Sequence, residues 1–124
     1  MTPPTILLDR TFLAALADAS HEHADRAGER YAALVQRYRD HEIRLRARQD
    51  HLAEIDQSVR RTLLAPVERI SVARQFRRQA DRLDLPFGVE PDVAVTLVVM
   101  RRESIAGIAS FDESFDQVAV ERIS

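Results

Sequence analysis

Residues 5–9 read TILLD, and residues 108–112, near the other end of the chain, read IASFD. Each is a short apolar run that ends in an aspartate, Asp9 in the first and Asp112 in the second. Continuous apolar runs of this length are typical of buried strands in a parallel sheet. The carboxyl ends of neighbouring strands in such a sheet meet at one crevice, where ligands bind. We therefore expect Asp9 and Asp112 to lie near each other.

A third aspartate, Asp92, opens the apolar segment 93–100. Clustered carboxylates repel each other, and their pKa values rise unless a cation neutralises them. Mg²⁺ and Mn²⁺ are cations that bind oxygen ligands of this kind. The three aspartates together therefore indicate a divalent-metal site, of the kind that supports phosphodiester chemistry.

Each aspartate also has a purely structural interpretation. Asp9 could cap a helix that starts near Thr11, and Asp92, directly after Pro91, could be an N-cap or a first-turn acid. Asp112 could be a turn residue in the sequence FDESF. For any one of these aspartates the structural role remains an alternative. The order of the three aspartates along the chain favours a shared metal site.

Hydrophobic spacing predicts strands and helices that alternate along the chain. Strands are expected over 5–8, 42–47, 67–70, 105–111 and 118–123, and helices over 11–17, 24–40, 49–64, 72–84 and 92–102. Such alternation predicts a largely parallel sheet with helices on both faces. Ser71 is the expected N-cap of the helix over 72–84. The arginines within 42–47 predict a strand near a sheet edge, and residues 1–124 are expected to form a single domain.

The composition excludes several kinds of chemistry. Without cysteine, the chain has no disulfide, thiolate zinc site or cysteine nucleophile. All 18 basic residues are arginine, which excludes a P-loop lysine and Schiff-base chemistry. The net charge of −2 creates no overall positive field toward nucleic acid. Neither a signal peptide nor a membrane-spanning segment is visible, so a cytoplasmic protein is expected.

The arrangement of these residues resembles the PIN-domain nucleases, in particular the small VapC-like toxins of toxin–antitoxin pairs. The resemblance is carried by ILLDRTFL at 6–13, DVAV at 92–95 and IASFDESF at 108–115. It implies an α/β, three-layer α/β/α fold, with a largely parallel central sheet of about five short strands flanked by helices. It also implies a metal-dependent endoribonuclease that uses Mg²⁺ or Mn²⁺ to hydrolyse RNA, an antitoxin protein as partner and a homodimer. Helices over 11–17 and 24–40 could supply the dimer face or the groove for an antitoxin helix.

The resemblance also implies which acids form the site. Asp9, Glu54, Asp92 and Asp112 correspond to the metal-binding, catalytic acids of the family, and Asp116 is a further metal-ligand candidate near the same crevice. Glu54 lies on the expected helix over 49–64. Asp50, one turn earlier on that helix, could face the site instead.

Arginines are the expected RNA-binding residues. Arg74, Arg77, Arg78 and Arg82 recur at helical spacing and form a basic stripe, from which we take Arg74 and Arg78 as substrate-binding residues. A solvated helix face is the alternative for this stripe. Arg10 follows Asp9 directly, where the family commonly carries a small residue. Arg10 could pair with Asp9 and compete with the metal, or it could contact an RNA phosphate.

Arg10 and two further departures from the family pattern leave a second function open. Arg46 and Arg48 lie where the second strand usually has a serine or threonine, and the stretch from Glu54 to Asp92 is short. The alternative is a catalytically silent PIN-like protein–protein interaction module. The four histidines lack zinc-motif spacing, so we expect them at the surface.

Overall fold

The computed structural model describes residues 2–86 and 88–124. Its five strands form one sheet with the order β3-β2-β1-β4-β5, and every neighbouring pair is parallel. The strands are β1 (Thr5–Leu8), β2 (Arg44–Arg48), β3 (Val67–Ile70), β4 (Gly107–Ala109) and β5 (Glu121–Ile123). The expected parallel sheet is therefore confirmed.

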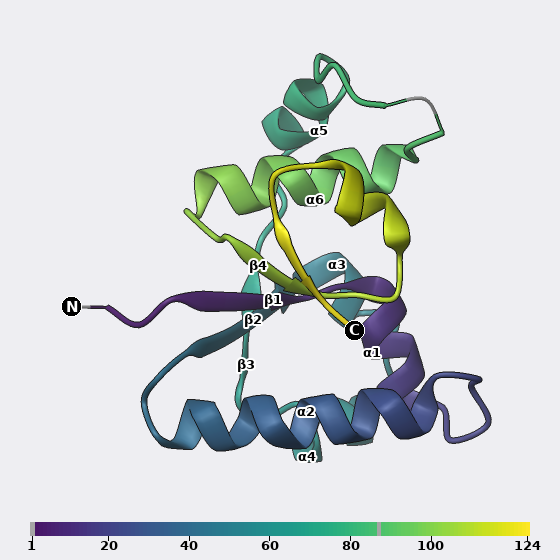
Figure 1. Cartoon of the computed structure of the whole chain (residues 1–124), viewed down its shortest axis with the longest axis vertical. Coiled ribbons are helices and arrows are strands. Elements are labelled where there is room, and N and C mark those ends of the chain that lie inside the picture. The colour runs from purple at the N-terminus through teal and green to yellow at the C-terminus, as the bar shows by residue number, and fades with distance from the viewer. Residues whose placement is uncertain (1, 87) are drawn as a thin grey trace.

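Helices cover both faces of the sheet (Figure 1). One face is covered by α1 (Arg10–Ala17), α2 (Ala24–Arg39), α3 (Gln49–Leu52) and α4 (Gln57–Thr62), and the other by α5 (Arg74–Ala80) and α6 (Pro91–Arg102). A short 3₁₀ helix, η1 (Glu113–Gln117), connects β4 to β5. This arrangement confirms the three-layer α/β/α architecture.

Each face of the sheet has its own hydrophobic core, because strand side chains alternate between faces. In β1, Ile6 and Leu8 pack with α1 and α2, whereas Leu7 packs with α6. Helix α6 is buried from Val93 to Met100. Full burial of one large aliphatic side chain contributes about 1.5–3 kcal/mol, so α6 is a major anchor of the second core.

Strand β2 lies between β1 and the edge strand β3, so it is near the edge of the sheet as expected. Three arginines on one face of an inner strand are tolerated because each has an acidic partner. Arg44 pairs with Glu68, Arg46 with Glu103 and Arg48 with Asp50. These partners lie outside the strand, so the sequence of β2 alone does not show how its arginines are neutralised.

The helix expected over 49–64 is two helices, α3 and α4. The second begins at a new N-cap, Asp56, whose carboxylate accepts a hydrogen bond of 2.8 Å from the backbone N–H of Ser58. The expected capping role of Ser71 is also wrong. Helix α5 begins after Ala73, and the Ser71 hydroxyl donates instead to the Gln49 side chain.

The last two strands are shorter than expected, because only Gly107–Ala109 and Glu121–Ile123 pair with a neighbouring strand. None of the helices in the described part of the chain is long and apolar enough to cross a membrane.

Candidate active site

Asp9 follows the last residue of β1, and its side chain is turned toward the end of β4. The Asp9 Oδ2 atom accepts hydrogen bonds from the hydroxyls of Ser110 (2.8 Å) and Thr11 (3.1 Å). Asp9 is only 5% exposed. Although it occupies the N-cap position of α1, its side chain makes no capping hydrogen bond. The carboxylate is therefore held by two hydroxyls and is available for a role other than capping.

Asp112 lies beside the same hydroxyl group. Its backbone N–H donates to Ser110 Oγ (3.0 Å), the atom that also donates to Asp9. Its carboxylate accepts a hydrogen bond from the backbone N–H of Ser114 (2.9 Å) and so caps η1. Ser110 thus links Asp9 and Asp112 from opposite ends of the sequence.

Asp92 lies in the first turn of α6, and its carboxylate is in contact with three basic side chains. Its carboxylate is 3.1 Å from His51 Nε2 and 3.1 Å from an Arg48 guanidinium nitrogen, and Arg10 lies at 3.6 Å. The hydrogen bond from His51, together with the charges of Arg48 and Arg10, outweighs burial and lowers the pKa of Asp92 to about 2. Asp92 is therefore ionised at neutral pH.

Arg48 is the buried centre of this region, with a side chain only 1% exposed. It binds Asp50 through two nitrogens and donates to the backbone carbonyl of Asp92 (3.1 Å) and to Thr96 Oγ1 (2.9 Å). Burial raises the pKa of Asp50, but the hydrogen bond and charge of Arg48 outweigh it, and the pKa is lowered. Arg48 therefore ties the end of β2 to the first turn of α6.

Arg10 bridges two of the candidate metal ligands. Its guanidinium makes two hydrogen bonds to Glu54, of 3.0 and 2.9 Å, in addition to its ion pair with Asp92. In the described structure it forms no ion pair with Asp9, so of the two alternatives for Arg10 the competing Asp9–Arg10 pair is not the one observed. The Arg10 side chain is 45% exposed, and this leaves it room to change partners.

The remaining predicted residues lie farther from this network. Asp116 is 54% exposed and bound by two nitrogens of Arg122, at 2.8 and 2.9 Å. Arg74 and Arg78 are exposed on α5. Arg77, from the same helix but outside the predicted set, reaches Asp50 at 3.4 Å.

Sequence reasoning missed His51, which is 1% exposed and not at the surface as expected. It lies on α3, directly after β2, and the carboxyl end of a parallel strand is where functional residues gather. This position, just after the carboxyl end of a strand, is the sequence feature that could have identified His51 as a functional residue. Its burial depends on the packing of α6, which a local pattern does not show.

Asp50, His51 and Asp92 form the one group of potential metal ligands in the described residues whose ligand atoms lie within 4.8 Å of each other. Arg48, however, already binds both of these aspartates. Two unit charges 4 Å apart interact by about 4 kcal/mol at an effective dielectric constant of 20, and a divalent ion beside Arg48 would be repelled more strongly. This group is therefore a poor site for Mg²⁺ or Mn²⁺.

The comparisons with known proteins concern the fold. VapC20 of Mycobacterium tuberculosis, a toxin that cleaves the sarcin–ricin loop, has a similar structure, with a TM-score of 0.64. The similarity covers 93% of this chain and 98% of that one, with 20% of residues identical. The chain has a VapC-like PIN fold. No family model matches the chain, and no curated protein matches its sequence.

Proposed function

We propose that the chain is a metal-dependent endoribonuclease, the cytoplasmic toxin of a type II toxin–antitoxin pair. The proposal is carried by the acids at the carboxyl end of the sheet in a fold shared with a toxin that cleaves RNA. Ser110 joins Asp9 to Asp112, and Arg10 joins Glu54 to Asp92. These four are the catalytic acids of the proposal.

The side of this site formed by Asp9 and Asp112 fits a divalent cation. In the described part of the chain, no cationic side chain pairs with either residue, so a bound ion would displace no arginine or histidine there. Asp92 adds a third carboxylate, at which the ion would compete with Arg10 and Arg48. Mg²⁺ or Mn²⁺ would be held by these three residues, and the waters that Mg²⁺ retains can bridge the longer gaps. Asp116 is a more distant ligand candidate, because Arg122 binds it.

The ion, when bound, would lower the pKa of a water molecule and offset negative charge on the phosphate. The protein's own residues orient the reactants. Ser110 and Thr11 fix the direction of the Asp9 carboxylate. Arg10, exposed and already at the site, would release Glu54 and bind an RNA phosphate, a ligand that suits a guanidinium. Arg74 and Arg78 would add positive charge for the RNA on α5.

The proposed partner is an antitoxin helix or a second copy of the chain. A groove of about 830 Å³ runs between α1, α2 and α4, with Leu16, Val35 and Leu63 among its apolar lining. Leu63 is 41% exposed, the one large hydrophobic side chain of the described residues to be so exposed. An amphipathic helix or a dimer contact would cover this surface.

Specific contacts also favour the second candidate, a silent PIN-like interaction module. Arg10 neutralises Glu54, and the buried Arg48 neutralises Asp50 and part of the charge on Asp92. If these pairs do not open, the site lacks the net negative charge that a divalent ion needs.

Expression of wild type and Asp9→Asn in bacterial cells tests the nuclease. The wild type should arrest growth and create new RNA ends at a small set of positions, whereas Asp9→Asn should do neither. The exposed Asp84→Asn removes one charge elsewhere and should behave as the wild type. Equal cleavage by wild type and Asp9→Asn would overturn the assigned site, and the absence of cleavage by all three would favour the silent module.

A further inference from the structure

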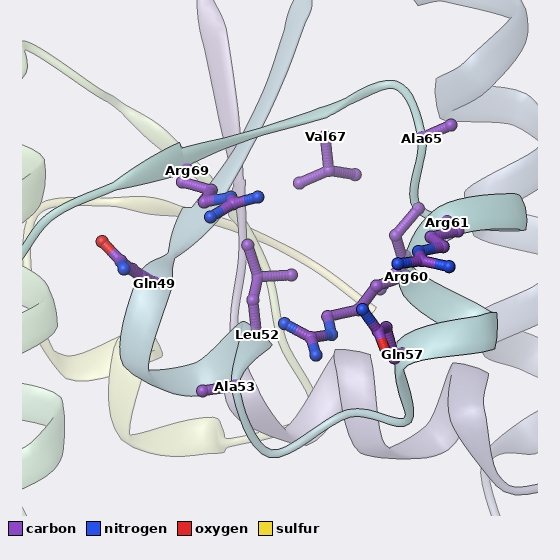
Figure 2. A pocket seen from close by; sticks show the side chains of 10 residues that line it. Gln49, Leu52, Ala53, Gln57, Arg60, Arg61, Ala65, Val67 and Arg69 are labelled. Atoms are coloured by element: carbon purple, nitrogen blue, oxygen red, sulfur yellow. The ribbon is translucent and has the colours of Figure 1, made fainter.

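A second cavity, of about 450 Å³, lies between α3, α4 and β3 (Figure 2). Its volume is within the usual range of small-molecule sites. Three arginines line it, Arg60 and Arg61 from α4 and Arg69 from β3, and none of the lining residues is acidic. The lining of the cavity is therefore positively charged, although the net charge of the protein is −2.

The local structure explains why these arginines face one space. In and just after α4, Gln57, Arg60, Arg61 and Leu64 follow the spacing of one helix face. Along β3, side chains alternate, so Val67 and Arg69 face the cavity while Glu68 faces the other side of the sheet. Glu68 is bound there by Arg44 at 2.7 Å, and so it is unavailable to Arg69.

The three arginines have no ion pair or side-chain hydrogen bond with any of the described residues. The Nε atom of Arg60 is buried and has no hydrogen-bond partner. The neighbouring acid, Asp56, is already bound by the backbone N–H and the hydroxyl of Ser58, at 2.8 and 2.6 Å. A buried donor without a partner is destabilising, and an acceptor supplied by a ligand would remove that cost.

Figure 2 shows how the charged groups lie around an apolar centre. The guanidinium groups of Arg60 and Arg69 lie on either side of Leu52, and the Val67 side chain also points into the space between them. The Gln49 amide points away from the other labelled side chains. The cavity thus offers separated cations above a surface of aliphatic carbon.

We propose that this pocket binds the phosphate group of a nucleotide, either free or within an RNA chain. Guanidinium groups bind phosphate oxygens in pairs, and a phosphate monoester carries a charge of about −1.5 to −2 at pH 7, enough to offset the repulsion between the arginines. Leu52 and Val67 accept the adjoining sugar or base. Binding needs neither metal nor the acids at the carboxyl end of the sheet, so the proposal is independent of the nuclease activity.

The test measures binding of three probes to the full-length chain at low salt with EDTA: inorganic phosphate, uridine 5′-monophosphate and a short labelled single-stranded RNA. The wild type should bind at least one of them saturably. The Arg60→Gln/Arg69→Gln variant should bind that probe at least tenfold more weakly. Arg26→Gln/Arg39→Gln, which removes the same charge from exposed positions on α2, should bind within about twofold of the wild type.

The probes identify the source of the phosphate. Binding of the mononucleotide identifies a free-nucleotide pocket, and binding of RNA alone identifies a contact for the RNA backbone. Arg60→Lys/Arg69→Lys keeps the charge but loses the planar pair of donors, so it should also bind the probe more weakly than the wild type. This variant replaces the glutamine variant in the test if the glutamine variant does not fold. The proposal is overturned if the wild type binds no probe, or if the pocket and control variants bind equally well.

Discussion

At the residue scale, the central feature is that arginines form ion pairs with two of the proposed metal-site acids, Glu54 and Asp92. Arg10 binds Glu54 through two hydrogen bonds and lies 3.6 Å from Asp92. A unit positive charge at this distance competes with a divalent ion by several kcal/mol even at an effective dielectric constant of about 20. Arg10 therefore sets the metal affinity of the proposed site.

Replacement of Arg10 should strengthen metal binding. Arg10→Thr frees Glu54 and removes one positive charge beside Asp92, so the Kd for Mn²⁺ should fall by about tenfold or more, since 1.4 kcal/mol corresponds to a factor of ten. Isothermal titration calorimetry measures this Kd. Arg39→Thr, on the far helix α2, is the matched control and should leave it unchanged. An unchanged affinity in Arg10→Thr would mean that Glu54 and Asp92 take no part in metal binding.

Asp92 predicts a loss of stability in acid. Its pKa of about 2 in the folded protein is below the ordinary value of 3.8, so the ionised carboxylate stabilises the fold above pH 4. This contribution, about 2 kcal/mol for a shift of this size, is lost as the pH falls from about 4 to 2. Urea unfolding at several pH values should show the stability gap between wild type and Asp92→Asn closing over that interval. A gap that stays constant would show that the pKa is not depressed.

At the scale of elements, the parallel pairing of β1 and β4 brings Asp9 and Asp112 together, and Arg48 connects β2 to α6. Strands 5–8 and 67–70 were predicted with their observed bounds, because a buried parallel strand is a local apolar run. The break before Asp56 and the partners of the β2 arginines were not. The break is set by a local cap of Asp56 on Ser58, whereas the acidic partners of Arg44 and Arg46 lie far along the chain.

Two of the three arginine pairs of β2 should differ sharply in their effect on stability. Arg48→Met removes the buried partner of Asp50 and leaves Asp92 with His51 and Arg10, so it should reduce the free energy of unfolding by about 3–5 kcal/mol. Arg44→Met removes a partly exposed pair with Glu68 and should cost less than about 1 kcal/mol. Denaturant unfolding of both variants gives the comparison. Similar losses would show that Arg48 does not hold α6 in place.

At the scale of the whole molecule, the acids and the arginine pocket lie at different places on one sheet. The acids follow β1, α3 and β4, whereas the pocket lies on β3 with α3 and α4. The sequence could predict the fold and the meeting of Asp9 with Asp112, since both follow from strand order. It could not predict the burial of His51 or the pocket, because these depend on how α6 and α4 pack.

The most direct test of the nuclease proposal is a titration of Mn²⁺ against thermal unfolding of wild type and Asp9→Asn. At 100 times its Kd, a ligand stabilises the folded state by about 2.7 kcal/mol, which raises the Tm of a domain of this size by several degrees. We predict this rise in the wild type and its loss in Asp9→Asn. Absence of a rise in the wild type, or an equal rise in both, would contradict a metal site at Asp9.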